Sequence, residues 1–240
     1  MNVDEYLTSL RNDGEAFAQA CAKNMSAQVP SCPEWTVTKL MNHMGRVHRW
    51  AAMAAGDENG AAPDGFPPAP KEITPEWYLS ELNFLIDVLT NTDPTAPRWN
   101  FSPNDQIAGF WFRRQALEVA VHRWDAQLAT STPQPIGAAL AVDGINEILD
   151  IWIPQALASN SDFNLDGTLH LHATDEPGEW LISIVDSTIE VEHSHAKGSL
   201  ALQGTASDLY LWLWRRITEE RLNVFGDNSL ADAWKSLPWA

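Results

Sequence analysis

The chain has 240 residues, with 15 Lys and Arg against 32 Asp and Glu, which gives a formal net charge of −17. Hydrophobic residues make up 45% of the chain and charged residues 20%, so there is enough apolar material for a sizeable core and wholesale disorder is excluded. The acidic charge argues against nucleic acid or anionic lipid as the main partner, because both need a basic surface. Twelve Trp residues fit a core, a pocket or a subunit interface equally well.

The sequence also bears on the cellular compartment. No stretch approaches the roughly 20 apolar residues that a membrane helix needs. The N-terminal residues MNVDEYLTSLRNDGEAF lack the basic and apolar regions of a secretory signal, so we expect a soluble cytoplasmic protein. The two cysteines, Cys21 and Cys32, have no spaced partners, and they predict neither a disulfide framework nor a thiolate zinc site.

Helical patterns dominate the first part of the chain. Helices are predicted over residues 1–25, 36–55, 74–90, 108–129 and 137–158. Thr36 or Thr38 is the expected N-cap of the second helix, and the run from Thr74 through a proline to a glutamate is typical of a helix start. Recurrent Gly and Pro predict a long loop over 56–72, either a lid or a passive surface loop, and a second loop over 91–106. Together these features predict an antiparallel helical bundle over residues 1–158.

The pattern changes in the last third of the chain. Alternating residues over 168–174 and 179–185 predict a β-hairpin, and 187–193 is a third strand candidate. A helix over 206–218, a strand over 222–225 and a closing helix over 229–237 complete the prediction. Residues 159–240 therefore predict a small α+β domain, and the whole chain falls in the α+β class.

One group of residues in the helical part suggests metal chemistry. Glu118 and His122 are four residues apart on one predicted helix, so their side chains share a face. His43 lies in the apolar stretch of the second helix, where an ionisable group facing the core needs a partner. A shared metal ion would satisfy all three residues and leave a coordination position open, as catalytic metal sites do. The alternative is a hydrogen-bonded polar cluster without metal.

The other histidines are weaker candidates. His48 follows His43 by five residues, a rotation of about 140° along a helix, so it is expected to point away from that site and toward the surface. Two further pairs alternate along strand-like segments: His170 with His172, and His193 with His195. Each pair places both rings on one face, but neither has an evident carboxylate or third ligand. We therefore predict that both pairs are solvent-exposed histidines on strands.

Two segments resemble motifs of a known family. Residues 31–50, SCPEWTVTKLMNHMGRVHRW, resemble the segment around the first metal ligand of mycothiol-dependent maleylpyruvate isomerase-like proteins. Residues 113–126, RRQALEVAVHRWDA, resemble their second motif. The resemblance covers essentially the whole chain: residues 1–158 look like the family's DinB-like four-helix metal domain, and the rest looks like its C-terminal α+β domain.

The resemblance implies a divalent metal, of the zinc type, held by His43, Glu118 and His122. It also implies the low-molecular-weight thiol mycothiol as cofactor, in an actinobacterial cytoplasm. A metal with an open position can bind and deprotonate a thiol, and the thiolate can add to an electrophilic carbon. The implied enzyme is an isomerase or a thiol S-transferase, and its partners are a small-molecule thiol and an electrophile.

Several neighbours of the trio are candidates for supporting roles. Asp125, three residues after His122, either orients that ligand or forms a surface salt bridge. Four residues are candidates for substrate binding: Arg46, Arg114, Trp50 and Trp111. The arginines either hold a substrate carboxylate or form ion pairs, and the tryptophans either wall the pocket or pack in the core.

Two other functions compete with thiol chemistry. A metal-dependent hydrolase would use metal-activated water as its nucleophile. A non-catalytic protein of the same fold would bind metal or ligand without turnover. The sequence leaves the electrophile, the native metal and the oligomeric state open.

Overall fold

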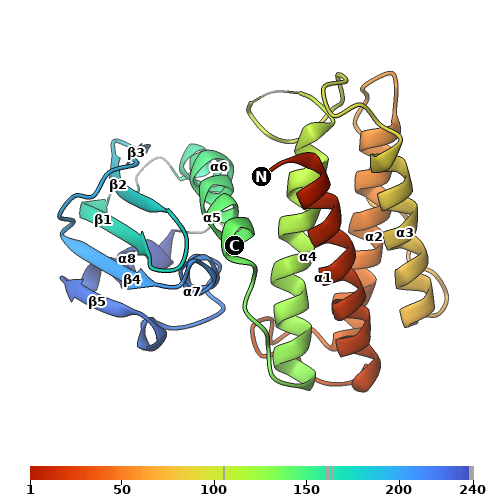
Figure 1. Ribbon diagram of the computed structural model, residues 1–240, viewed down its shortest axis with the longest axis horizontal. Helices are drawn as coiled ribbons and strands as arrows, with labels where there is room; N and C mark the ends of the chain where they lie inside the picture. The colour runs from red at the N-terminus through yellow and green to blue at the C-terminus, as the bar shows by residue number, and fades with distance from the viewer. Residues whose placement is uncertain (105, 161–162, 164, 238–240) are drawn as a thin grey trace. The chain divides into compact units, whose positions relative to one another are not determined.

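The computed structural model of the chain describes residues 1–104, 106–160, 163 and 165–237 (Figure 1). Residue 105 of the loop expected over 91–106, and six residues of the expected second domain (161, 162, 164 and 238–240), lie outside the described residues. The chain divides into two compact units, Met1–Gln134 and Pro135–Ala240. This division places the helix expected over 137–158 in the second unit, whereas the sequence assigned it to the first. No helix in the described ranges is both long and apolar enough to cross a membrane.

The first unit is the predicted four-helix bundle. Its helices are α1 (Val3–Lys23), α2 (Val37–Gly56), α3 (Pro75–Thr90) and α4 (Gly109–Thr130). Asn2 and Glu5 form a reciprocal capping box at the start of α1. Thr36, rather than Thr38, caps α2, and Thr74 caps α3 directly before its N1 proline.

The bundle has two helices in each direction, and α2 and α3 are parallel neighbours (Figure 1). Arg49 of α2 pairs with Glu81 of α3, and seven residues further along each helix Gly56 lies beside Val88. A helix as long as α2 rises about 30 Å, so a parallel neighbour cannot follow it through a tight turn. Residues 57–74 are the connection that returns the chain along the bundle, which explains why this Gly- and Pro-rich segment is long.

The second unit combines helices with one sheet. Its elements in chain order are α5 (Ala138–Glu147), the π-helical η1 (Ile148–Trp152), α6 (Ile153–Ser159), β1 (Leu165–Ala173), β2 (Glu179–Val185), β3 (Thr188–Glu192), β4 (Leu200–Gly204), α7 (Ala206–Leu213), the 3-10 turn η2 (Glu219–Arg221), β5 (Asn223–Gly226) and α8 (Ser229–Ser236). The hairpin, the third strand and the closing helix agree with the prediction to within a few residues. Strand β4 was not predicted from the sequence. The helix predicted over 206–218 ends at Leu213, because Arg215 takes a left-handed conformation with φ of 59°.

The strand order in the sheet is β3-β2-β1-β4-β5. Strands β1 and β4 are parallel, and the other neighbouring strands are antiparallel. Because β3 lies at one edge and β4 lies beyond β1, the chain over 193–199 must cross both β2 and β1. We call this segment the crossover loop.

Candidate metal centre

The three predicted metal ligands meet between α2 and α4, which run in opposite directions. His43 of α2 places Nε2 3.3 Å from Oε1 of Glu118 on α4. His122, one turn further along α4, places Nε2 3.4 Å from the same oxygen. One donor atom from each residue lies within 4.8 Å of the other two. The structure therefore brings His43 together with Glu118 and His122, the pair that the helical spacing singled out.

Arg114 holds the second oxygen of Glu118. Its Nη2 is 2.5 Å from Oε2, and the arginine is only 3% exposed. Burial alone would raise the pKa of Glu118, but the charge of Arg114 and the hydrogen bonds with His122 and His43 hold that pKa well below its usual range. The carboxylate is therefore anionic, with Oε1 left facing the two imidazoles. Of the alternatives for Arg114, the structure shows an ion pair with a neighbour on its own helix.

Asp125 fixes the ring of His122. Its Oδ2 accepts a hydrogen bond from Nδ1 at 2.9 Å, and its Oδ1 accepts one from the hydroxyl of Ser31 at 2.5 Å. Asp125 is fully buried, so it is not the surface salt bridge that the sequence allowed. Burial disfavours the imidazolium, but Asp125 and Glu118 outweigh burial and raise the pKa of His122 to about 9. Because Asp125 engages Nδ1, it is Nε2 that faces Glu118.

The turn between α1 and α2 completes the surroundings of the trio. It brings Ser31 to Asp125 and places the ring of Trp35 5.0 Å from that of His43 and 6.4 Å from that of His122, between centroids. Ser31 was not among the candidate site residues predicted from the sequence. The only signal for it was its place in the motif that also contains Trp35 and His43.

The donor set suits a zinc-type ion. Two imidazole nitrogens and one carboxylate oxygen are the ligands of many catalytic zinc sites, in which a fourth position stays open. The side chains of His43, Glu118 and His122 are 33%, 18% and 11% exposed, so solvent reaches the trio from the side of His43. Nδ1 of His122 is bonded to Asp125, and Oε2 of Glu118 is bonded to Arg114. Metal ligands in proteins are commonly oriented by such hydrogen bonds from the atom that does not bind the metal.

Arg46 of α2 lies against the loop that joins α2 to α3. Its Nε donates to the carbonyl oxygen of Pro67 at 2.6 Å, and its guanidinium carbon lies 5.9 Å from the centroid of Phe66. Together with Arg49 and Trp77 these residues line a cavity of about 630 Å³. Arg46 therefore holds the 57–74 connection against α2.

Trp50 and Trp111 belong to an aromatic cluster. Their ring centroids are 5.2 Å apart and nearly perpendicular, and Trp99, Phe101 and Phe110 pack around them. Trp111 is fully buried and donates its indole N–H to the carbonyl oxygen of Trp99 at 2.9 Å. Trp111 thus has the core role that the sequence allowed for it, whereas Trp50 is only partly buried and also packs against the exposed Phe66.

His48 is buried, so the expected surface position is wrong. Its Nδ1 lies 2.8 Å from Oε1 of Gln115 on α4, and its Nε2 lies 3.2 Å from the hydroxyl of Tyr78 on α3. Burial lowers the pKa of His48 to about 4, although the hydrogen bond with Gln115 acts in the opposite direction. The rotation away from His43 was inferred correctly, but that direction is covered by the parallel helix α3.

The strand histidines also differ from expectation. His170 is only 5% exposed and is not a solvated residue. His172 and His195 both contact the carboxylate of Glu179, a partner that the sequence pattern did not predict. His193 is exposed, as expected.

Comparisons with known proteins place the chain in a family. Residues 7–127 match the mycothiol maleylpyruvate isomerase N-terminal domain, and residues 139–233 match the C-terminal domain of the same family, the MDMPI C-terminal domain. The crystal structure of a histidine-to-alanine mutant of the mycothiol-dependent maleylpyruvate isomerase is similar, with a TM-score of 0.61, 13% identity and 93% coverage of each chain. A second crystal structure of the mycothiol-dependent maleylpyruvate isomerase gives a TM-score of 0.58 at 16% identity, also with 93% coverage of each chain.

At such low identities the solved structures support the fold alone. No curated protein sequence matches the chain at a significant level. The two domain matches follow one another along the chain and cover both of its structural units. The chain therefore belongs to the mycothiol maleylpyruvate isomerase family.

Proposed function

We propose that this protein is a divalent-metal-dependent enzyme that uses mycothiol as a thiolate nucleophile, in an isomerisation or a thiol S-transfer. One observation carries the proposal: two imidazoles and a carboxylate from two helices converge at a partly exposed point. The family match and the names of the solved relatives support mycothiol as the thiol. The donor set favours Zn²⁺ as the metal.

His43, Glu118 and His122 would hold the ion. When bound, the ion would supply the positive charge that lowers the pKa of a thiol and yields thiolate at neutral pH. Arg114 keeps Glu118 ionised and fixes its orientation through Oε2. Asp125 accepts a hydrogen bond from the protonated Nδ1 of His122, which leaves the lone pair of Nε2 for a bond to the metal.

The thiolate sulfur would attack an electrophilic carbon of the second substrate. In an isomerisation the new C–S bond turns a double bond into a rotatable single bond. Its later cleavage restores the double bond and releases the thiol unchanged. In an S-transfer the C–S bond remains in the product. Both reactions need the same thiolate and differ only in whether that bond breaks again.

Metal analysis followed by calorimetric titration with mycothiol tests the proposal. Both His43→Ala and Glu118→Gln should lose one equivalent of metal relative to wild type, and mycothiol binding with it. Glu81→Gln is the matched control, because Glu81 is also a bundle carboxylate paired with an arginine, Arg49. It should keep both the metal and the thiol.

The outcomes separate the competing functions. Equal metal content in wild type and the two trio variants would overturn the metal site. One equivalent held by the trio without mycothiol binding would overturn thiol use and favour the hydrolase. Binding of both without turnover of any electrophile would favour the non-catalytic alternative.

A further inference from the structure

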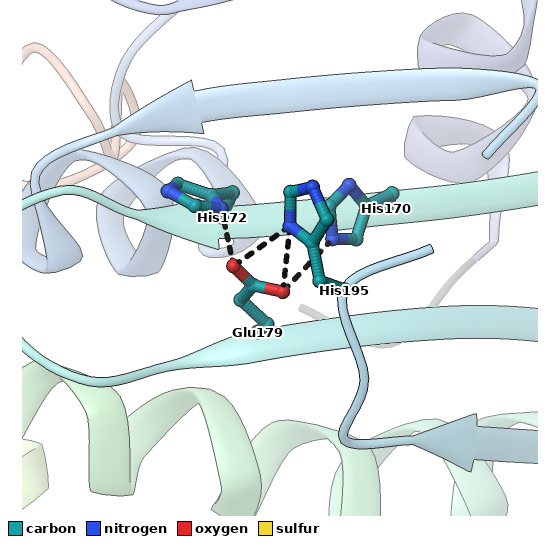
Figure 2. Close-up of side chains that lie close together, drawn as sticks. All are labelled: His170, His172, Glu179 and His195. Atoms are coloured by element: carbon teal, nitrogen blue, oxygen red, sulfur yellow. Dashed lines mark hydrogen bonds and ion pairs between the residues drawn. The ribbon is translucent and has the colours of Figure 1, made fainter. Parts of the chain in front are cut away.

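Three histidines and a glutamate of the second unit converge on one point (Figure 2). Glu179 lies at the centre of the group: its Oε1 is 2.6 Å from Nδ1 of His172, and both of its oxygens are 3.1 Å from Nδ1 of His195. Nε2 of His170 is 3.8 Å from Oε2 of the same carboxylate. One donor atom from each of the four residues lies within 4.8 Å of all the others.

The topology of the sheet builds this group from three separate segments. His170 and His172 are two residues apart on β1, so both point to the same face of the sheet. The antiparallel register of β1 and β2 sets His172 directly opposite Glu179. His195 comes from the crossover loop, which passes over these two strands on its way from β3 to β4.

The crossover loop buries His170. A Cβ on Gly198 would lie 2.9 Å from both the backbone nitrogen and the Cβ of His170, so the loop backbone rests directly on this residue. Nε2 of His170 is buried and has no hydrogen-bond partner among the residues that the structure describes. Buried polar atoms are nearly always satisfied, so this nitrogen, aimed at Glu179, calls for an explanation (Figure 2).

We propose that His170, His172, Glu179 and His195 bind one divalent transition-metal ion of the zinc type. Three imidazoles and a carboxylate give four protein ligands, the number found in closed, structural zinc sites. The ion would satisfy the buried nitrogen of His170 and would fasten the crossover loop to β1 and β2. The site therefore has a structural role, in contrast to the open site proposed for the first unit.

The observed spacing allows the group to close around an ion. Zn–ligand bonds of about 2.0–2.1 Å in a tetrahedron place the donor atoms about 3.4 Å apart. The side chains of His195 and His172 are 80% and 28% exposed, so both have room to adjust. His170 is buried, and Glu179 is held in place by its strand, β2. These two residues form the less mobile half of the site.

Titration of the full-length Glu118→Gln variant with Zn²⁺ isolates this site, since the substitution removes a ligand of the first one. The variant should bind one equivalent, and Co²⁺ should give the absorption bands of a tetrahedral site. Adding His195→Ala to this background should weaken Zn²⁺ binding beyond the roughly 10–100-fold typical of losing a residue behind a ligand. His195 is exposed, so its removal does not threaten the fold.

His193→Ala in the same background is the matched control. His193 lies on the same loop, is exposed, and stands outside the group of four. It should leave Zn²⁺ affinity unchanged. Zn²⁺ should also raise the melting temperature of Glu118→Gln, and this rise should vanish with His195→Ala but persist with His193→Ala.

Two results would overturn this second site. One is a Glu118→Gln protein that binds no Zn²⁺. The other is unchanged Zn²⁺ affinity after both His195→Ala and His172→Gln. Neither result bears on the proposed enzyme function. That function is tested by whether the protein loses one equivalent of metal when His43 or Glu118 is substituted.

Discussion

The fully buried Asp125 accepts a hydrogen bond from His122, with Oδ2 2.9 Å from Nδ1. We predict that Asp125→Asn weakens Zn²⁺ binding at the first site by about 10–100-fold, the usual effect of removing a carboxylate behind a histidine ligand. The amide cannot supply the negative charge that makes His122 a stronger donor. Competition with a chromogenic chelator measures the affinity.

Asp13→Asn provides the control for that variant. Asp13 also pairs with a residue of α4, since its Oδ1 is 2.8 Å from Nε of Arg123. Its loss should lower stability without changing Zn²⁺ affinity. Equal losses of affinity in the Asp125 and Asp13 variants would show that Asp125 acts only through the stability of α4.

The parallel contact of α2 and α3 depends on the absence of a side chain at Gly45. A Cβ there would overlap the ring of Trp77. Gly45→Ala should therefore lower the free energy of unfolding by about 1–3 kcal/mol through overpacking, less a helix-propensity gain of up to about 1 kcal/mol. Urea denaturation measures the change.

Gly56→Ala is the corresponding substitution at the end of the same helix. Its Cβ would stand 3.3 Å from a methyl carbon of Val88, a contact that a small movement of one side chain relieves. It should cost clearly less than Gly45→Ala. A smaller loss of stability at Gly45 than at Gly56 would contradict the close α2–α3 contact.

Local signals predicted the bundle and most of the trio. Thr36 and Thr74 mark helix starts through bonds within one turn, and Glu118 and His122 share a face because of their spacing alone. His43 was placed with them by a weaker argument, that a histidine on an apolar helix face needs a partner. A residue's position on its own helix does not reveal which helix packs against it. For the same reason, nothing in the sequence indicated that α3 covers His48, and the predicted surface position was wrong.

In the second unit, long-range strand pairing limited how much of the structure could be predicted from the sequence. Strand β4 is five residues long and is held by β1 in parallel and by β5, pairings that no local pattern reveals. Glu179 meets His172 only because the turn between β1 and β2 fixes their register. Its contact with His195 further depends on the path of the crossover loop.

The two cysteines should differ in reactivity. Cys21 is fully buried, and burial raises the pKa of its thiol to about 12, whereas Cys32 is partly exposed. Because the thiolate is the reactive form, a disulfide reagent at pH 8 should modify Cys32 in the native protein and Cys21 only after unfolding in urea. Rapid native modification of two thiols in wild type, and of one in Cys32→Ser, would contradict this expectation.

Buried His48 should make stability depend on pH. Its pKa of about 4 in the folded protein lies below the unfolded value of about 6.5, so the unfolded chain binds the extra proton between these values. Stability is therefore lost as the pH falls through this window, by about 1 kcal/mol at pH 5.5 and about 3 kcal/mol in full.

Urea denaturation of metal-free wild type and His48→Gln at pH 7.5 and 5.5 isolates this contribution from that of the other titrating groups. Glutamine keeps a polar side chain near Gln115 and Tyr78 but takes up no proton. The variant should be less stable than wild type at pH 7.5, and the gap should narrow by about 1 kcal/mol at pH 5.5. A gap that stays constant would mean that His48 is protonated as readily in the folded protein as in the unfolded chain. A gap that widens would mean that the folded protein stabilises the imidazolium, against the desolvation expected from its burial between Gln115 and Tyr78.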